Sequence, residues 1–169
     1  MKNLIVLFPG KSYTVNHPLL YYAGFKYVAN GYECKKVSYE ERLDIAETVS
    51  VVLEQLKDIN FSEYKDVLFI SKSLGTVVAG HVSEVLNINV RHVYLTPIIS
   101  TLPFICGGKN ISVVAAGTAD SFIDADILKE HCEREGIRLE LFEGADHGLE
   151  VSDDVDNNID VLKRVIELC

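Results

Sequence analysis

Short apolar runs alternate with longer amphipathic stretches along the chain, and this alternation limits the possible folds more than any other feature of the sequence. The runs predicted to be strands are Leu4–Phe8, Cys34–Ser38, Val67–Ile70, Arg91–Leu95, Ile111–Ala116 and Arg138–Phe142. The stretches predicted to be helices are Pro18–Asn30, Glu41–Lys57, Leu74–Leu86, Ile123–Glu135 and Asp154–Leu168. Strands that alternate with helices form a parallel sheet with helices on both faces. We therefore expect a three-layer, doubly wound α/β fold in a single domain over residues 1–169.

The charge of each strand predicts its place in the sheet. Leu4–Phe8 and Val67–Ile70 are continuously apolar, as strands in the middle of a parallel sheet are. Cys34–Ser38 and Arg138–Phe142 carry charged residues, which suits sheet edges. With these two as edges, the simplest order of about six parallel strands is 2-1-3-4-5-6. Ligands of such sheets bind where the order reverses, outside the carboxyl ends of strands one and three.

Local signals mark where several helices begin and end. Ser38 and Glu41 have the spacing of a capping box, which predicts that the second helix begins there. Asp124 and Asp126 are placed to cap and open the fourth helix, and Gly136 to end it.

Composition and charge argue against several classes of partner. Lys and Arg number 16 against 25 Asp and Glu, for a net charge of −9, so the chain lacks the basic surface of a nucleic-acid binder. We expect no membrane partner either, because no apolar run approaches the roughly 18 residues of a spanning helix. The histidines and the four scattered cysteines show no metal-ligand spacing, so we expect no metal. Without a signal-peptide pattern, reduced thiols and a cytoplasmic location are expected.

One motif falls in a loop where the strand order reverses. Ser71-Lys72-Ser73-Leu74-Gly75 follows a predicted strand and precedes a predicted helix. It matches the nucleophile elbow G-x-S-x-G, with Ser71 in place of the first glycine. In an elbow the apex serine has a strained backbone, and small flanking residues allow the helix and a neighbouring strand to approach. We therefore predict that Ser73 is a nucleophile and that the N–H of Leu74, at a helix N-terminus, binds an oxyanion.

A serine hydroxyl is a weak nucleophile unless a base takes its proton, and the base needs an acid to orient it. Asp120 follows the fifth predicted strand, and His147 follows the sixth. Ser73, Asp120 and His147 thus occur in the chain order of one kind of Ser-His-Asp triad, all beyond the carboxyl ends of parallel strands. Asp146 adjoins the histidine and is expected to shape the loop rather than to serve as the triad acid.

Taken together, these motifs resemble those of a small α/β hydrolase related to dienelactone hydrolases and short bacterial esterases. The resemblance covers nearly the whole chain and is carried by Phe8–Lys11, Ser71–Gly75, Gly117–Asp120 and Ala145–Gly148. It implies a minimal α/β-hydrolase core without a lid domain, because the segment where larger members insert a lid is short. It also implies that Ser73 is the nucleophile, His147 the base and Asp120 the orienting acid.

The resemblance further implies a second oxyanion donor in the turn after the first strand. Many members have His-Gly-x there, and the backbone N–H of x is the donor. This chain has Pro9-Gly10-Lys11, so the Lys11 amide is the expected donor and Pro9 replaces the usual histidine.

We therefore expect a serine hydrolase that cleaves a small ester or thioester through an acyl-enzyme, with a small acyl substrate and no cofactor. The main alternative is a catalytically silent binding module on the same fold. Gly10-Lys11-Ser12 also suggests a nucleotide-binding loop, but the first glycine of that motif would fall on Ile5.

Overall fold

The computed structural model describes residues 1–151 and 153–169. The strands are β1 (Lys2–Phe8), β2 (Glu33–Lys36), β3 (Tyr64–Lys72), β4 (Arg91–Leu95), β5 (Asn110–Gly117) and β6 (Leu139–Phe142). The α-helices are α1 (Pro18–Ala29), α2 (Ile45–Leu56), α3 (Leu74–Leu86), α4 (Ala125–Glu135) and α5 (Val155–Leu168). Two 3₁₀ helices cover Phe61–Glu63 and Ile99–Phe104.

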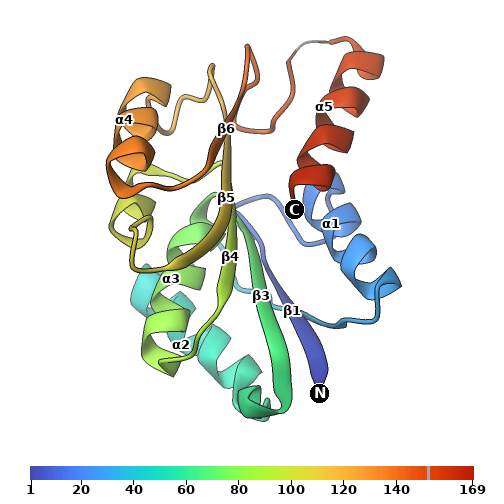
Figure 1. Cartoon of the computed structure of the whole chain (residues 1–169), viewed down its shortest axis with the longest axis vertical. Helices are drawn as coiled ribbons and strands as arrows, with labels where there is room; N and C mark the ends of the chain where they lie inside the picture. Colours follow the sequence, from blue (N-terminus) through green and yellow to red (C-terminus); the bar gives the residue numbers. More distant parts are fainter. Residues whose placement is uncertain (152) are drawn as a thin grey trace.

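All neighbouring strands pair in parallel, in the order β2-β1-β3-β4-β5-β6. This confirms the predicted order and the charged strands β2 and β6 as edges. Helices α1 and α5 cover one face of the sheet, and α2, α3 and α4 cover the other (Figure 1). Three buried clusters fill the space between the layers, and the central strands contribute to both faces because successive side chains point to opposite sides.

The start of α2 corrects one prediction from the sequence. The helix begins at Ile45, not at Glu41, and its capping box is formed by Asp44 and Glu47. The predicted box failed because its two residues have other partners. Gln55 bonds the backbone N–H and carbonyl of Ser38, and the Glu41 carboxylate accepts from residue 12 of the loop after β1.

The predicted boundaries of α4 agree better with the structure. Asp124 is its N-cap, and the side chain accepts hydrogen bonds from the N–H groups of Asp126 and Ile127. Gly136 ends the helix with a φ of 68°, in the left-handed region that glycine tolerates.

Candidate active site

Ser73 lies in the sharp turn between β3 and α3, and its backbone is strained. Its φ is 53° and its ψ is −123°, a conformation that residues with a Cβ rarely adopt. The backbone N–H of Ser73 donates to the carbonyl of Leu95 at 3.0 Å, which ties the turn to the end of β4. These are the features expected of an elbow that presents its apex hydroxyl above the sheet.

Glycine is required beside this turn for a steric reason. A Cβ at position 75 would lie 2.4 Å from the carbonyl oxygen of Pro9 and 2.6 Å from that of Phe8. A Cβ at position 10 would lie 3.1 Å from the Cβ of Ser73. The end of β1 is therefore packed directly against the elbow.

The three side chains predicted from the sequence meet above the carboxyl edge of the sheet. The Oγ of Ser73 lies 2.8 Å from Nε2 of His147. Nδ1 of the same imidazole lies 2.7 Å from Oδ2 of Asp120. A neutral imidazole has one N–H, and a carboxylate can only accept, so Nδ1 donates to Asp120 and Nε2 accepts from the serine hydroxyl.

The carboxylate that bonds the imidazole is held firmly in place. Asp120 lies in the loop between β5 and α4, and its side chain has no exposed area. Its other oxygen, Oδ1, accepts from the backbone N–H of Phe122 at 2.8 Å. The ring of Phe122 packs on the imidazole of His147, with 4.2 Å between the ring centroids, yet 58% of this phenylalanine is exposed. An apolar surface thus lies open to solvent beside the histidine.

The loop that carries His147, between β6 and α5, is held by its own polar groups. The Asp146 carboxylate accepts from the backbone N–H groups of Gly148 and Glu150, at 2.7 and 3.1 Å. Asp146 therefore shapes the loop, as predicted. On the other side of the histidine, the N–H of Ala119 donates to the carbonyl of Ala145 at 2.9 Å, which joins this loop to the end of β5.

One predicted oxyanion donor belongs to the elbow, and the other belongs to the loop after β1, which packs against the elbow at Gly10. Leu74 is the first residue of α3, a position whose N–H has no acceptor within the helix. Lys11 lies in the loop after β1, between two anchored neighbours. The hydroxyl of Tyr39 donates to the carbonyl of Pro9, and the N–H and Oγ of Ser12 donate to Glu41 at 2.8 and 2.9 Å.

The same loop departs from the geometry of a phosphate-binding loop. In that motif the Lys-Ser pair leads directly into a helix. Here Ser12 has a φ of 55°, and α1 begins only at Pro18. The local structure therefore does not favour nucleotide binding.

Lys72 is a polar residue of this region that the sequence analysis did not single out. The residue is only 2% exposed. Its Nζ donates to Oγ1 of Thr96 at 2.9 Å and to the backbone carbonyl of His147 at 2.8 Å. It also lies 4.6 Å from the centre of the Tyr13 ring. The signal that could have identified Lys72 is its register in β3, where it continues a row of core positions.

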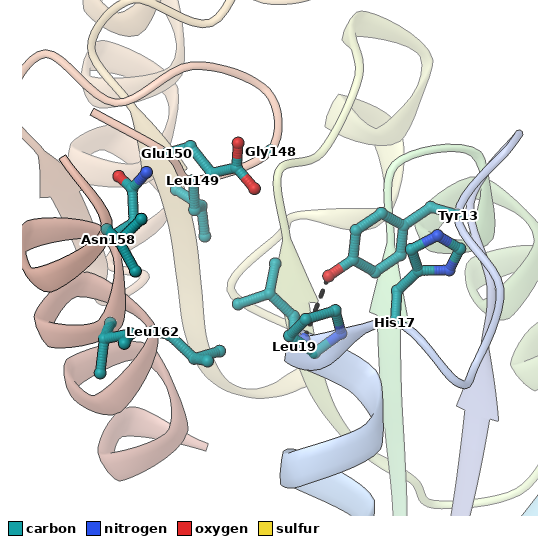
Figure 2. A pocket seen from close by; sticks show the side chains of 11 residues that line it. Tyr13, His17, Leu19, Gly148, Leu149, Glu150, Asn158 and Leu162 are labelled. Carbon is teal, nitrogen blue, oxygen red and sulfur yellow. Dashed lines mark hydrogen bonds between the residues drawn. The ribbon is translucent and has the colours of Figure 1, made fainter. Parts of the chain in front are cut away.

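A cavity of about 290 Å³ opens beside the histidine loop, between the first turns of α1 and α5 (Figure 2). Gly148, which directly follows His147, lines it. Its walls are mostly apolar, with Leu19, Leu149 and Leu162 among them. The volume is at the low end for small-molecule pockets.

The described residues contain no group of three His, Cys, Asp or Glu side chains that could hold a metal ion. Within the same ranges, none of the helices combines the length and apolar character needed to cross a membrane.

Solved structures share this architecture over almost all of the chain. A protein of Xanthomonas campestris pv. campestris, described as a candidate hydrolase of the α/β superfamily, has a TM-score of 0.73 at 15% identity, with 99% of this chain and 98% of that one covered. Est1E from Butyrivibrio proteoclasticus with ferulic acid bound has a TM-score of 0.71 at 11% identity, covering 98% and 87%. The esterase Pf2001 of Pyrococcus furiosus has a TM-score of 0.66 at 17% identity, covering 99% and 81%.

No protein-family model matches the sequence, and neither does any curated protein. Identities as low as those of the solved structures establish a common fold, so the reaction has to be argued from the site.

Proposed function

We propose that this chain, which has the α/β-hydrolase fold, is a serine hydrolase that cleaves a small ester or thioester. One observation carries the proposal: the unbroken series of hydrogen bonds from Ser73 through His147 to Asp120. The strained backbone at Ser73 supports it, since strain of this kind concentrates at functional sites.

The proposed reaction begins with attack by the hydroxyl of Ser73 on the substrate carbonyl. Nε2 of His147 takes the serine proton as the new C–O bond forms, and Asp120 stabilises the resulting imidazolium. The negative charge that develops on the carbonyl oxygen is bound by the N–H groups of Leu74 and Lys11. Collapse of the tetrahedral intermediate breaks the bond to the alcohol or thiol, which leaves with the proton held by His147.

The acyl group then remains on Ser73 until water removes it. His147 takes a proton from this water, a second tetrahedral intermediate forms, and the acid product leaves as the serine recovers its proton. These steps need no electron transfer and no external group carrier, so the chain's own residues suffice.

Two features support a substrate of modest size with an apolar part. The exposed ring of Phe122 offers an apolar surface next to His147. The cavity beside the histidine loop is small, at about 290 Å³. A short acyl or aromatic group would find apolar surface to contact in both places.

The proposed cellular setting follows from the cysteines. Cys34, Cys106, Cys132 and Cys169 are free thiols. Free thiols persist in a reducing compartment. We therefore place the reaction in the cytoplasm.

Hydrolysis assays with Ser73→Ala test the proposal. Suitable substrates are p-nitrophenyl acetate, p-nitrophenyl butyrate, an acetyl thioester and, because Est1E binds ferulic acid, a ferulate ester. Removal of the nucleophile should lower kcat about 10⁴-fold or more on every substrate that the wild type cleaves. The matched control is Ser71→Ala, because Ser71 is fully buried and its Oγ donates to the carbonyl of Val93. Full turnover by Ser73→Ala would refute the proposal.

A fluorophosphonate probe separates the enzyme from a silent binding module. The proposal predicts covalent labelling of the wild type and of Ser71→Ala at Ser73, located by peptide mass spectrometry, and none of Ser73→Ala. Folded wild-type protein that neither reacts with the probe nor hydrolyses any of the esters would instead support the module.

A further inference from the structure

One face of β3 is apolar along the buried part of the strand but ends in a lysine. Leu68 and Ile70 point into the buried cluster beneath α1 and α5. Lys72 is two residues further on, so the period of a strand places it on this same face. An ammonium group thus occupies a position where packing alone would favour an apolar side chain.

A buried ammonium costs several kcal/mol unless nearby groups compensate the lost water. Here the compensation comes from the groups that build the site. Lys72 donates to Thr96, at the end of β4, and to the backbone carbonyl of His147. The ring of Tyr13, from the loop after β1, lies against the ammonium. The lysine therefore connects three segments that converge on the elbow.

The bond to the carbonyl of His147 is the important one. The histidine loop is joined to β5 on one side, through Ala119 and Ala145. Lys72, the last residue of β3, bonds the same loop and directly precedes Ser73 in the chain. The backbone of the base is thus tied to the residue next to the nucleophile.

We propose that Lys72 is a positioning residue for His147: its ammonium group, bonded to the His147 carbonyl, holds the imidazole within proton-transfer distance of the Ser73 hydroxyl. This inference rests on the proposed hydrolase function.

The carboxylates around Lys72 help to keep its side chain a charged donor. Carboxylates that attract the ammonium come from two loops: Asp120 after β5, and Asp146 and Glu150 after β6. Burial lowers the pKa of Lys72 to about 8, and these carboxylates oppose that change. The side chain is therefore mostly charged at neutral pH. A charged ammonium has three N–H donors, enough for both the Thr96 hydroxyl and the His147 carbonyl.

The test compares Lys72→Met with Lys65→Met. Methionine keeps the length of the buried side chain but has neither donor nor charge. Lys65 is exposed on the same strand, so its variant makes the same change in net charge away from the site. In Lys72→Met we expect kcat to fall about tenfold or more through misplacement of the base, with KM within about twofold. The value of kcat/KM should fall by about the same factor as kcat. Lys65→Met should match the wild type.

A readout that needs no hydrolysis separates this inference from the proposed function. The ring NMR signals of His147, assigned with His147→Gln and recorded at one fixed pH, should be displaced or broadened in Lys72→Met but not in Lys65→Met. If Lys72→Met does not fold, Lys72→Gln, which keeps a polar end without charge, should show the same displacement. Unchanged kcat or unchanged ring signals in a folded Lys72 variant would overturn the inference. A wild type without hydrolytic activity would instead count against the proposed function, and the NMR comparison would still test Lys72.

Discussion

Residues with a strained backbone are concentrated around the candidate site. Among the described residues, five besides glycine have a positive φ, and four of these border the candidate site. They are Ser12, Ser73, Thr96 and Leu149. Each such residue costs of the order of 1–3 kcal/mol and persists only where its surroundings fix it. The strained residues in the loops after β1, β3, β4 and β6 therefore lower stability, but they fix the course of the loops that border the site.

The role proposed for Asp120 can be tested by replacing one of its carboxylate oxygens with an amide nitrogen. Asparagine at this position would offer an amide in place of a carboxylate oxygen to Nδ1 of the imidazole, which favours the wrong tautomer of His147. We expect Asp120→Asn to lower kcat about 10⁴-fold with little loss of stability. Steady-state kinetics on the best ester and a urea titration measure the two quantities.

The matched control for this change is Asp124→Asn. Asp124 caps α4 four residues later, and asparagine is also a good N-cap. Its variant should keep wild-type kcat. Comparable activity of the Asp120 and Asp124 variants would contradict the assigned role of Asp120.

At the scale of elements, the contact between the end of β1 and the start of α3 determines whether the elbow can form. Gly75→Ala places a Cβ within 2.4 Å of a backbone carbonyl of Pro9, which cannot move as a side chain would. We expect a loss of about 1–3 kcal/mol in the free energy of unfolding and a fall in kcat as the Lys11 loop shifts. Urea unfolding and ester hydrolysis measure these effects.

Gly108→Ala serves as the control, because a Cβ at Gly108 would meet no atom within 4 Å. That variant should stay within about 0.5 kcal/mol of the wild type. If Gly75→Ala were equally well tolerated, the close packing of β1 against the elbow would not be important for the site.

The elements that the sequence predicted well are those with strong local signals. Helix α3 spans Leu74–Leu86, as predicted, because an elbow begins it and Asn87, in the left-handed conformation, ends it. The start of α2 was wrong because two acceptable capping boxes compete within a few residues. Only the tertiary contacts of Ser38 and Glu41 decide between them, and sequence spacing does not contain those contacts.

The candidate site was predictable where topology alone brings residues together. The carboxyl ends of parallel strands share one edge, so the positions of Ser73, Asp120 and His147 followed from the strand order. Lys72 was missed because its importance depends on where its ammonium group points. The bond to the carbonyl of His147 joins residues 75 positions apart and leaves no local pattern.

At the scale of the whole molecule, site and sheet are one cooperative unit. The three side chains come from loops after β3, β5 and β6, and the bond between Ser73 and His147 spans 74 positions. No smaller part of the chain contains the site. Any condition that weakens the centre of the sheet should therefore reduce activity and global stability together.

Low pH should be one such condition, because the buried His92 lies in a central strand of the sheet. His92 in β4 is 2% exposed and stacks on Tyr94, and its Nδ1 has no hydrogen-bond partner among the described residues. Burial lowers the pKa of His92 to about 4, and the positive charge of Lys109 adds to this effect. In the unfolded chain a histidine titrates near 6.5.

The sign of the effect on stability follows from this difference. Between pH 6.5 and 4 the unfolded chain binds a proton at His92 that the folded protein does not, so stability falls as the pH is lowered through this range. The loss is of the order of 3 kcal/mol. Lys72 does not contribute there, because with a pKa of about 8 it is protonated in both states.

We therefore expect the free energy of unfolding, measured in urea, to decline from pH 7 to pH 4.5, and His92→Phe to flatten the decline. Phenylalanine keeps an aromatic ring between Phe69 and Tyr94 but cannot bind a proton. His81→Phe, at a half-buried position of α3 beside the ring of Phe104, should keep the wild-type slope. If the free energy of unfolding of His92→Phe declined as steeply as that of the wild type, the acid sensitivity would come from carboxylates elsewhere. The buried imidazole would then not limit the pH range over which the sheet stays folded and supports the site.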